Sequence, residues 1–174
     1  METRIYVACL ASYNAGELHG KWINANQTAD EIHAEISEML KASREVGAEE
    51  WAVHDYEGFG EISLSEWPDI GRVSKIASLI EDHGDAFSLW YNSQDAQHLE
   101  TDELEGRFLE QWQGAHDSKR DFADYLLEST GQLSELPEWA RGYFDFESYA
   151  RDLEISGDYS FVRANGQVYA FSSH

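Results

Sequence analysis

The strongest local fold signal in this chain lies near its end. Asn165-Gly166 separates two aromatic-rich runs, YSFVR and QVYAF, in which neighbouring side chains would face opposite sides of a sheet. An Asn-Gly pair between alternating runs is typical of a β-hairpin with a tight turn. The sequence therefore predicts an antiparallel hairpin over residues 159–171, and any fold for this chain must include β-sheet.

Three more strands are expected in the first 60 residues. Residues 5–10 are apolar at nearly every position, which favours a strand buried on both faces. After a loop, residues 19–25 have the character of a second strand. Residues 51–60 have the character of a third strand, which leads into a Gly-rich turn. The start of the chain thus contains enough strands for a small sheet.

Helical periodicity accounts for most of the remaining sequence. Thr28 and Glu31 match a capping box, and apolar residues on one helical face follow them. Later in the chain, Phe108 and Trp112 continue an apolar face that we expect to end at Gly114. The predicted helices span residues 28–43, 68–83, 85–92, 101–112, 118–130 and 146–154.

The order of these elements predicts an α+β fold with a helical middle and mixed helices and antiparallel strands at both ends. We expect an N-terminal α+β domain over residues 1–60 and a helical middle domain over 61–103. A C-terminal α+β domain would cover 104–174 and end in the hairpin. A chain of 174 residues is long enough for one compact domain or for two to three small ones.

The charge balance limits what this chain can bind. It has 34 Asp and Glu against 12 Lys and Arg, a net charge of −22. Because such a surface repels nucleic acid and anionic membranes and attracts basic molecules, we expect neither nucleic acid nor membrane as a partner. A single cysteine and the lack of a signal-peptide pattern or a long apolar run indicate a cytoplasmic protein.

The acids are concentrated in two regions. Residues 30–60 hold nine acids and two bases, and residues 81–128 hold thirteen and three. Within them, Glu31, Glu35 and Glu38 fall on one helical stripe. A second stripe in the 118–130 helix repeats this spacing. A single acidic stripe is usually a solvated helix face, but two stripes within such segregation favour a binding surface.

Like charges four residues apart destabilise a helix by about 0.2–0.5 kcal/mol per pair. We expect two helical ion pairs to relieve part of this, Arg120 with Asp124 and Arg107 with Glu103. The candidate partner-binding residues are Asp30, Glu31, Glu35, Glu38, Glu49, Glu50, Glu81, Asp82, Asp85, Asp102, Glu103, Glu105, Glu110, Asp117, Asp121, Asp124 and Glu128.

The sequence lacks the common motifs of catalysis and metal binding. It has no H-E-x-x-H, paired cysteine, EF-hand loop, Walker A or G-x-S-x-G pattern. His54 and Asp55 are neighbours, but alternation along a strand would send them to opposite faces. We therefore predict no catalytic residue, no cofactor and no metal, and a protein that is not an enzyme.

Two alternatives stay open. A glycan hydrolase would need two carboxylates across a cleft and could use aromatic rings to hold sugars. However, the positions of Trp112, Tyr125 and Tyr169 favour a place in the core. A general acidic chaperone for basic proteins would need only the negative surface.

Three long stretches resemble the ArdA antirestriction family: RIYVACLASYNAGELHGKWINA, GAEEWAVHDYEGFG and FESYARDLEISGDY. The similarity runs from Arg4 to Phe171. It implies a protein of mobile genetic elements that mimics double-stranded DNA. Such a protein occupies the DNA groove of type I restriction-modification enzymes and protects incoming DNA.

The resemblance also implies an elongated molecule of three small domains and a homodimer formed through the C-terminal domain. The segment tied to antirestriction in the family corresponds to DFADYLLESTGQL, residues 121–133.

Overall fold

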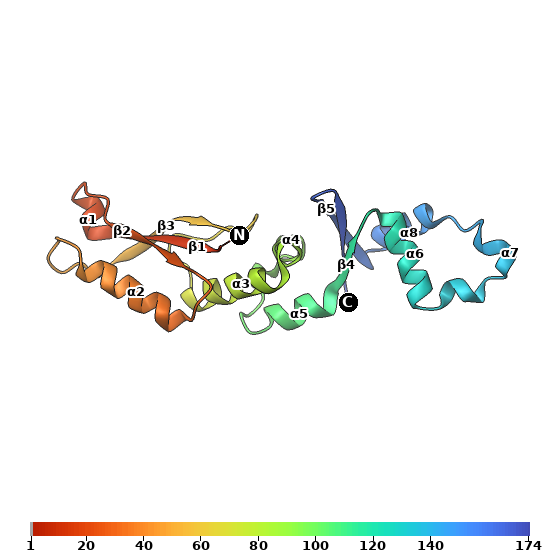
Figure 1. The fold of residues 1–174 in the computed structure, drawn as a ribbon, viewed down its shortest axis with the longest axis horizontal. Helices are drawn as coiled ribbons and strands as arrows, with labels where there is room; N and C mark the ends of the chain where they lie inside the picture. Colours follow the sequence, from red (N-terminus) through yellow and green to blue (C-terminus); the bar gives the residue numbers. More distant parts are fainter. Residues whose placement is uncertain (1) are drawn as a thin grey trace.

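The computed structural model describes residues 2–174. Within them the chain forms a mixed α+β fold with eight α-helices and two small antiparallel sheets of three strands each. The helices α2, α3, α5, α6 and α7 follow one another along the long axis of the molecule, whereas β5 and the C-terminus lie near its middle (Figure 1).

The first sheet is built from the three strands expected at the start of the chain. β1 (Arg4–Cys9) lies between β2 (Gly20–Asn24) and β3 (Trp51–Glu57), and both pairings are antiparallel. Ile5 faces Ile23 on one side and Tyr56 on the other. The central position of β1 explains why its sequence is almost entirely apolar, since both of its edges and much of both faces are covered.

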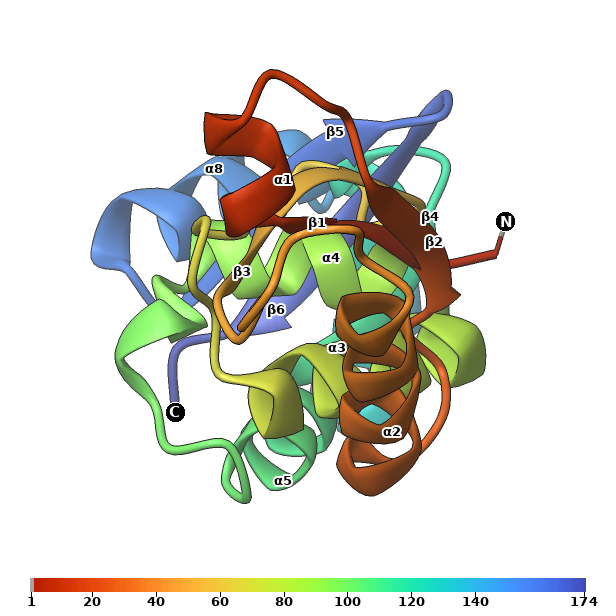
Figure 2. The same ribbon diagram turned by 90° about the vertical axis from the view of Figure 1, so that its left-hand side faces the viewer.

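Two helices belong to this sheet, and only one was predicted. α2 (Ala29–Lys41) begins with the expected capping box and buries Ile32, Ile36 and Met39. α1 (Leu10–Asn14) is a short helix where we expected a loop, and it has no side-chain cap. Because one turn of helix needs little apolar periodicity, local pattern could not reveal it. α1 and α2 lie on opposite sides of the sheet (Figures 1 and 2).

The middle of the chain is helical, as predicted. α3 (Ile70–His83) starts at Asp69, whose carboxylate accepts a hydrogen bond from the backbone N–H of Arg72 at 2.6 Å. It ends at Gly84, which has φ +59° and leads directly into α4 (Asp85–Ser93). The turn η1 (Ala96–His98) follows.

The predicted 101–112 helix is shorter than expected. α5 (Leu104–Gln111) stops before Trp112, and residues Trp112–His116 form β4, a strand that we did not predict. The pairing of β4 with β6 shifts register between Trp112 and Ala115, and Gly114 lies in this bulge with φ +99°. The glycine therefore supports a β-bulge rather than a helix end.

The C-terminal elements otherwise follow the prediction. α6 (Lys119–Ser129) is capped by Ser118 and α8 (Phe146–Ser156) by Asp145. Between them lie the short η2 (Gln132–Glu135) and α7 (Glu138–Arg141). The predicted hairpin forms from β5 (Tyr159–Ala164) and β6 (Gln167–Ser172), and the second sheet has the order β4-β6-β5.

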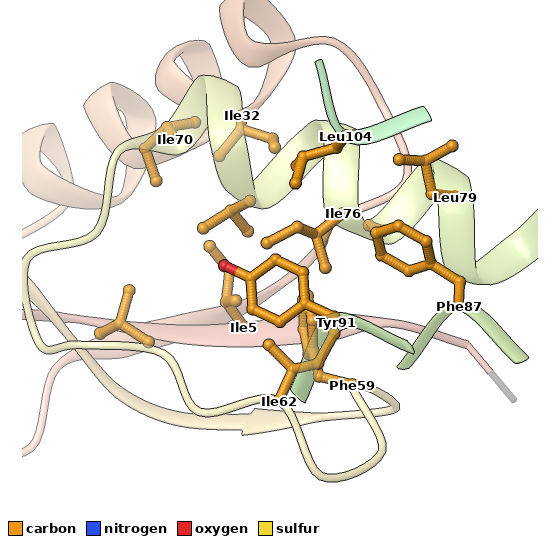
Figure 3. Packing of buried hydrophobic residues seen from close by; sticks show 14 of the residues in the cluster. Ile5, Ile32, Phe59, Ile62, Ile70, Ile76, Leu79, Phe87, Tyr91 and Leu104 are labelled. Carbon is orange, nitrogen blue, oxygen red and sulfur yellow. The ribbon is translucent and has the colours of Figure 1, made fainter. Parts of the chain in front are cut away.

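One large apolar cluster extends through most of the molecule. Side chains from β1, α2, α3, α4 and α5 point toward one another, as Ile5, Ile32, Ile76 and Leu104 show (Figure 3). The cluster continues to Phe171 on β6, and a smaller one joins α6, α8 and β6. Because the large cluster takes residues from all three expected domains, packing does not mark their limits, and the boundaries at 61 and 104 stay predictions.

Aromatic rings connect the middle helices to the second sheet. Phe87 packs edge-on against Phe108, Phe108 stacks on Trp112, and Trp112 contacts Phe171 at a centroid distance of 5.3 Å. Trp112 is only half-buried, and Tyr169 is buried as expected. Tyr125 is 54% exposed and belongs to neither apolar cluster, so its predicted place in the core is wrong; its ring contacts that of His116 at a centroid distance of 5.4 Å.

Candidate partner-binding surface

The seventeen candidate acids all lie at the surface. Glu35, Asp121 and Asp124 are half-buried, and the other fourteen are exposed. An ionised carboxylate is costly to bury without a partner, so this placement is what the charge requires. Exposure alone does not distinguish a binding surface from a solvated one, and the contacts of each acid are more informative.

The stripe on α2 contains three acids in three different situations. Glu31 Oε2 accepts hydrogen bonds from Thr28 Oγ1 at 2.6 Å and from the Thr28 backbone at 2.9 Å, which lower the pKa of Glu31. The carboxylate of Glu35 accepts a hydrogen bond from Gln27 Nε2 at 2.8 Å and lies 2.6 Å from Lys21 Nζ, and both contacts lower the pKa of Glu35. Within residues 2–174, Glu38 has no ion pair within 4 Å. The stripe thus holds one capping acid, one paired acid and one free acid.

The two acids of α5 form ion pairs with one base from α3 and one from α5 itself. Lys75 of α3 donates a hydrogen bond to Glu105, which lowers the pKa of this carboxyl. Arg107 lies 3.4 Å from Glu110, so the predicted pair with Glu103 is wrong. The carboxylate of Glu103 instead accepts the backbone N–H of Glu100 at 3.3 Å and closes the turn before the helix.

The stripe at α6 is the least neutralised. Ser118 Oγ donates to Asp121 Oδ2 at 2.6 Å and accepts the Asp121 backbone N–H at 3.1 Å, so this acid belongs to the helix cap. Arg120 lies 3.7 Å from Asp121, and its predicted pairing with Asp124 is wrong. In the described part of the chain, Asp117, Asp124 and Glu128 have no Lys or Arg within 4 Å.

Few acids of the whole protein are paired. Seven ion pairs to Lys or Arg within 4 Å engage seven of the 34 acids across residues 2–174. The helices with the predicted stripes, α2 and α6, follow one another along the long axis with α5 between them (Figure 1). Most of the negative charge therefore stays available on a framework of packed helices.

Sequence reasoning missed the ion pairs that join separate elements. Lys21 and Glu35, Lys75 and Glu105, and Lys119 and Glu154 are 14, 30 and 35 residues apart. Helical spacing reports only neighbours three or four positions away, so no local signal could have found them.

The structure offers little that resembles a catalytic centre. Across residues 2–174 there is no group of three or more His, Cys, Asp or Glu that could hold a metal ion. His54 packs edge-on against Tyr13, and Asp55 accepts the backbone N–H of Tyr56 at 2.8 Å. In the same described range, no helix has the length and apolar character needed to cross a membrane.

The family model described as antirestriction protein (ArdA) matches residues 5–167. The chain belongs to the ArdA family. This membership supports an antirestriction protein. A comparison with curated proteins found no match.

The segment for which the resemblance predicts an antirestriction role, residues 121–133, covers most of α6 and the start of η2. Phe122 and Leu127 are buried, whereas Asp121, Asp124 and Glu128 lie at the surface. The same helix thus supplies both core packing and acidic surface, so a substitution in it must be checked for stability before it is interpreted as a loss of binding.

Proposed function

We propose that this protein inhibits type I restriction-modification enzymes by occupying their DNA-binding groove as a mimic of double-stranded DNA. The observation that carries this proposal is that twelve of the seventeen candidate carboxylates are exposed and have no Lys or Arg within 4 Å in residues 2–174. In this account the protein acts by binding, without catalysis, in the cytoplasm of a cell that receives a mobile element.

The charge is of the right magnitude for such a mimic. Duplex DNA carries about one negative charge per 1.7 Å of its axis, or about two per base pair. A net charge of −22 therefore corresponds to about 11 base pairs, and two chains with twice that charge to about 22. DNA-binding enzymes direct Lys and Arg at phosphates, and such contacts position a duplex without reading its sequence.

The proposed mimic is an elongated homodimer of chains with three small domains each. The C-terminal part offers a plausible interface because β5 is the edge strand of the second sheet, with an unpaired row of backbone groups. Ile155, which precedes β5, is 75% exposed. Sedimentation at low micromolar concentration tests this part: a persistent monomer would halve the proposed mimicked length.

The mimic is tested by displacement. A type I enzyme bound to a DNA column should elute when this protein is added, because the protein and the DNA compete for the same Lys and Arg of the enzyme. Higher salt should weaken the binding of the protein to the enzyme, because salt screens these contacts. A general acidic chaperone would bind histones as tightly as the enzyme, so equal affinities would contradict the proposal. Sustained release of sugar product from a polysaccharide, lost in Glu→Gln variants, would instead favour the hydrolase alternative.

A further inference from the structure

Two large aromatic side chains are exposed near one another in the N-terminal part of the molecule. Trp67 is 66% exposed and Tyr13 is 56% exposed. An exposed aromatic ring of this size does not contribute to folding the free energy that its burial would give. Single exposed apolar residues are normal, but an exposed Trp and an exposed Tyr at one cavity require an explanation.

Both rings line a cavity of about 520 Å³ formed by α1, β3 and the segment before α3. His54 of β3 packs edge-on against Tyr13, with the ring centroids 5.0 Å apart and an interplanar angle of 82°. Glu66 lines the same cavity, and its backbone carbonyl accepts the N–H of Val53 at 2.8 Å. This hydrogen bond ties the segment that carries Trp67 to β3.

The cavity lies apart from the acidic stripe on α2. Its Tyr13 belongs to α1, and α1 and α2 lie on opposite sides of the first sheet (Figures 1 and 2). Duplex DNA presents stacked bases inside and phosphates outside, so mimicry of its charge does not account for exposed aromatic rings. What distinguishes these two rings from other exposed aromatic residues is that they line the same cavity.

We infer that this aromatic cavity binds an arginine side chain of the basic partner, an inference that rests on the proposed function. A guanidinium is planar, weakly hydrated and permanently charged, and it stacks on the faces of Trp and Tyr. Glu66, an acidic residue, belongs to the same lining. A lysine ammonium is compact and strongly hydrated, so it gains less from the same rings.

The chain itself places a guanidinium over a Trp or Tyr ring twice, and over the Phe146 ring once, through Arg120. The guanidinium of Arg4 lies 5.1 Å from the centroid of the Trp22 ring, and that of Arg72 lies 5.6 Å from the centroid of Tyr91. Trp67 and Tyr13 offer the same ring types, and none of the cation–ring contacts in residues 2–174 involves them. An arginine of the partner would contact Trp67 and Tyr13 in the way that Arg4 contacts Trp22 and Arg72 contacts Tyr91.

The test compares two peptides of equal charge, hexa-arginine and hexa-lysine, in titrations of the full chain followed by calorimetry. The acidic surface attracts both, so the preference for hexa-arginine isolates the aromatic contact. Each ring at an exposed site contributes about two- to fivefold in affinity. The double variant Tyr13→Ala/Trp67→Ala should therefore lose about tenfold in hexa-arginine affinity and keep its hexa-lysine affinity.

Trp139 and Tyr143 provide a matched control, since they are 77% and 85% exposed and lie outside the cavity lining. Trp139→Ala/Tyr143→Ala should leave the arginine preference intact, and Tyr13→Phe/Trp67→Phe should keep most of it. Equal binding of the two peptides to the wild type, or equal losses in the control, would overturn the inference and leave the proposed function standing. If neither peptide binds at low salt, the acidic surface does not attract polycations, and both proposals fail.

Discussion

The indole Nε1 of Trp90 donates a hydrogen bond of 2.8 Å to Oε1 of Gln111, and both side chains are buried. Trp90 belongs to α4 and Gln111 is the last residue of α5, immediately before β4. This bond therefore joins the middle helices to the start of the second sheet. It fixes the position of an acid-bearing helix through the core.

Replacing Gln111 by Leu should destabilise the protein, because the buried N–H of Trp90 would lose its acceptor. The expected loss is about 1–3 kcal/mol in the free energy of unfolding. Urea unfolding followed by circular dichroism measures it. Gln111→Glu keeps an acceptor oxygen at the same place but buries a charge, so it should be at least as destabilising. No change in either variant would show that this bond does not hold α4 and α5 together.

Arg72 holds the segment that follows α4. Its guanidinium donates to the carbonyls of Leu99 at 2.7 Å and Ala96 at 2.9 Å, and to Tyr91 Oη at 2.9 Å. A lysine has the charge but not the planar fork, so Arg72→Lys should lose most of these contacts. We expect a loss of about 1–3 kcal/mol in unfolding free energy, with faster amide exchange confined to residues 94–101. Unchanged exchange there would contradict this role.

Glu35 should contribute to stability in a pH-dependent way. Its pKa is lowered in the folded state by Gln27 and Lys21, so its contribution is complete above the unfolded value, near 4.5. The contribution disappears as pH falls through the lower, folded pKa. Glu35→Gln should therefore lower the melting temperature at pH 7 and have little effect at the acid end of the range in which the protein stays folded.

The control for this experiment is Glu38→Gln on the same stripe. Glu38 has no ion pair within 4 Å in the described residues, so its neutralisation removes repulsion from nearby acids and a weak attraction to Lys21, and it should change the melting temperature less than Glu35→Gln does. Equal losses at pH 7 in both variants would mean that helix propensity, and not the Lys21 and Gln27 contacts, determines the result.

The sequence could predict the features that depend on neighbouring residues. The caps at Thr28, Ser118 and Asp145 and the hairpin at Asn165-Gly166 form as expected, since each is a local backbone requirement. β4 was missed because its existence depends on pairing with β6, 52 to 59 residues later, and on a bulge that resembles a helix end in sequence.

The candidate surface was predictable in composition but not in detail. Helical spacing predicts that the two acidic stripes lie beside the apolar faces of their helices, and all seventeen candidate acids are exposed or half-buried. Which acids are neutralised depends on Lys21, Lys75 and Lys119, which come from other elements of the fold. The same spacing gave wrong partners for Arg107 and Arg120 because long side chains have several acids within reach.

The free acids of α6 should act together. Neutralising Asp117, Asp124 and Glu128 to the matching amides should weaken binding to the target enzyme far more than any one change. The affinity of the variant should also depend less steeply on salt concentration, because fewer opposite charges meet in its complex with the enzyme. Thermal unfolding should show equal or higher stability, since like charges are removed.

A matched triple variant, Glu2→Gln/Glu17→Gln/Glu61→Gln, changes the net charge equally at exposed sites outside the candidate surface. It should weaken binding less than the α6 variant. If the two triple variants lose the same affinity for the enzyme, binding depends on the net charge of the protein and not on where the acids lie. If a single amide substitution on α6 abolishes binding while the fold is kept, the partner reads a local site rather than a distributed surface.

Competition for the target enzyme tests the central claim most directly. The affinity of a type I enzyme for this protein would be measured at fixed salt with increasing amounts of duplex DNA, with and without the enzyme's recognition sequence. A mimic that occupies the DNA groove predicts that the apparent Kd for the protein rises in proportion to the concentration of either duplex, scaled by that duplex's own affinity. An apparent Kd that stays constant while the enzyme is saturated with DNA would place the protein elsewhere on the enzyme and contradict the account.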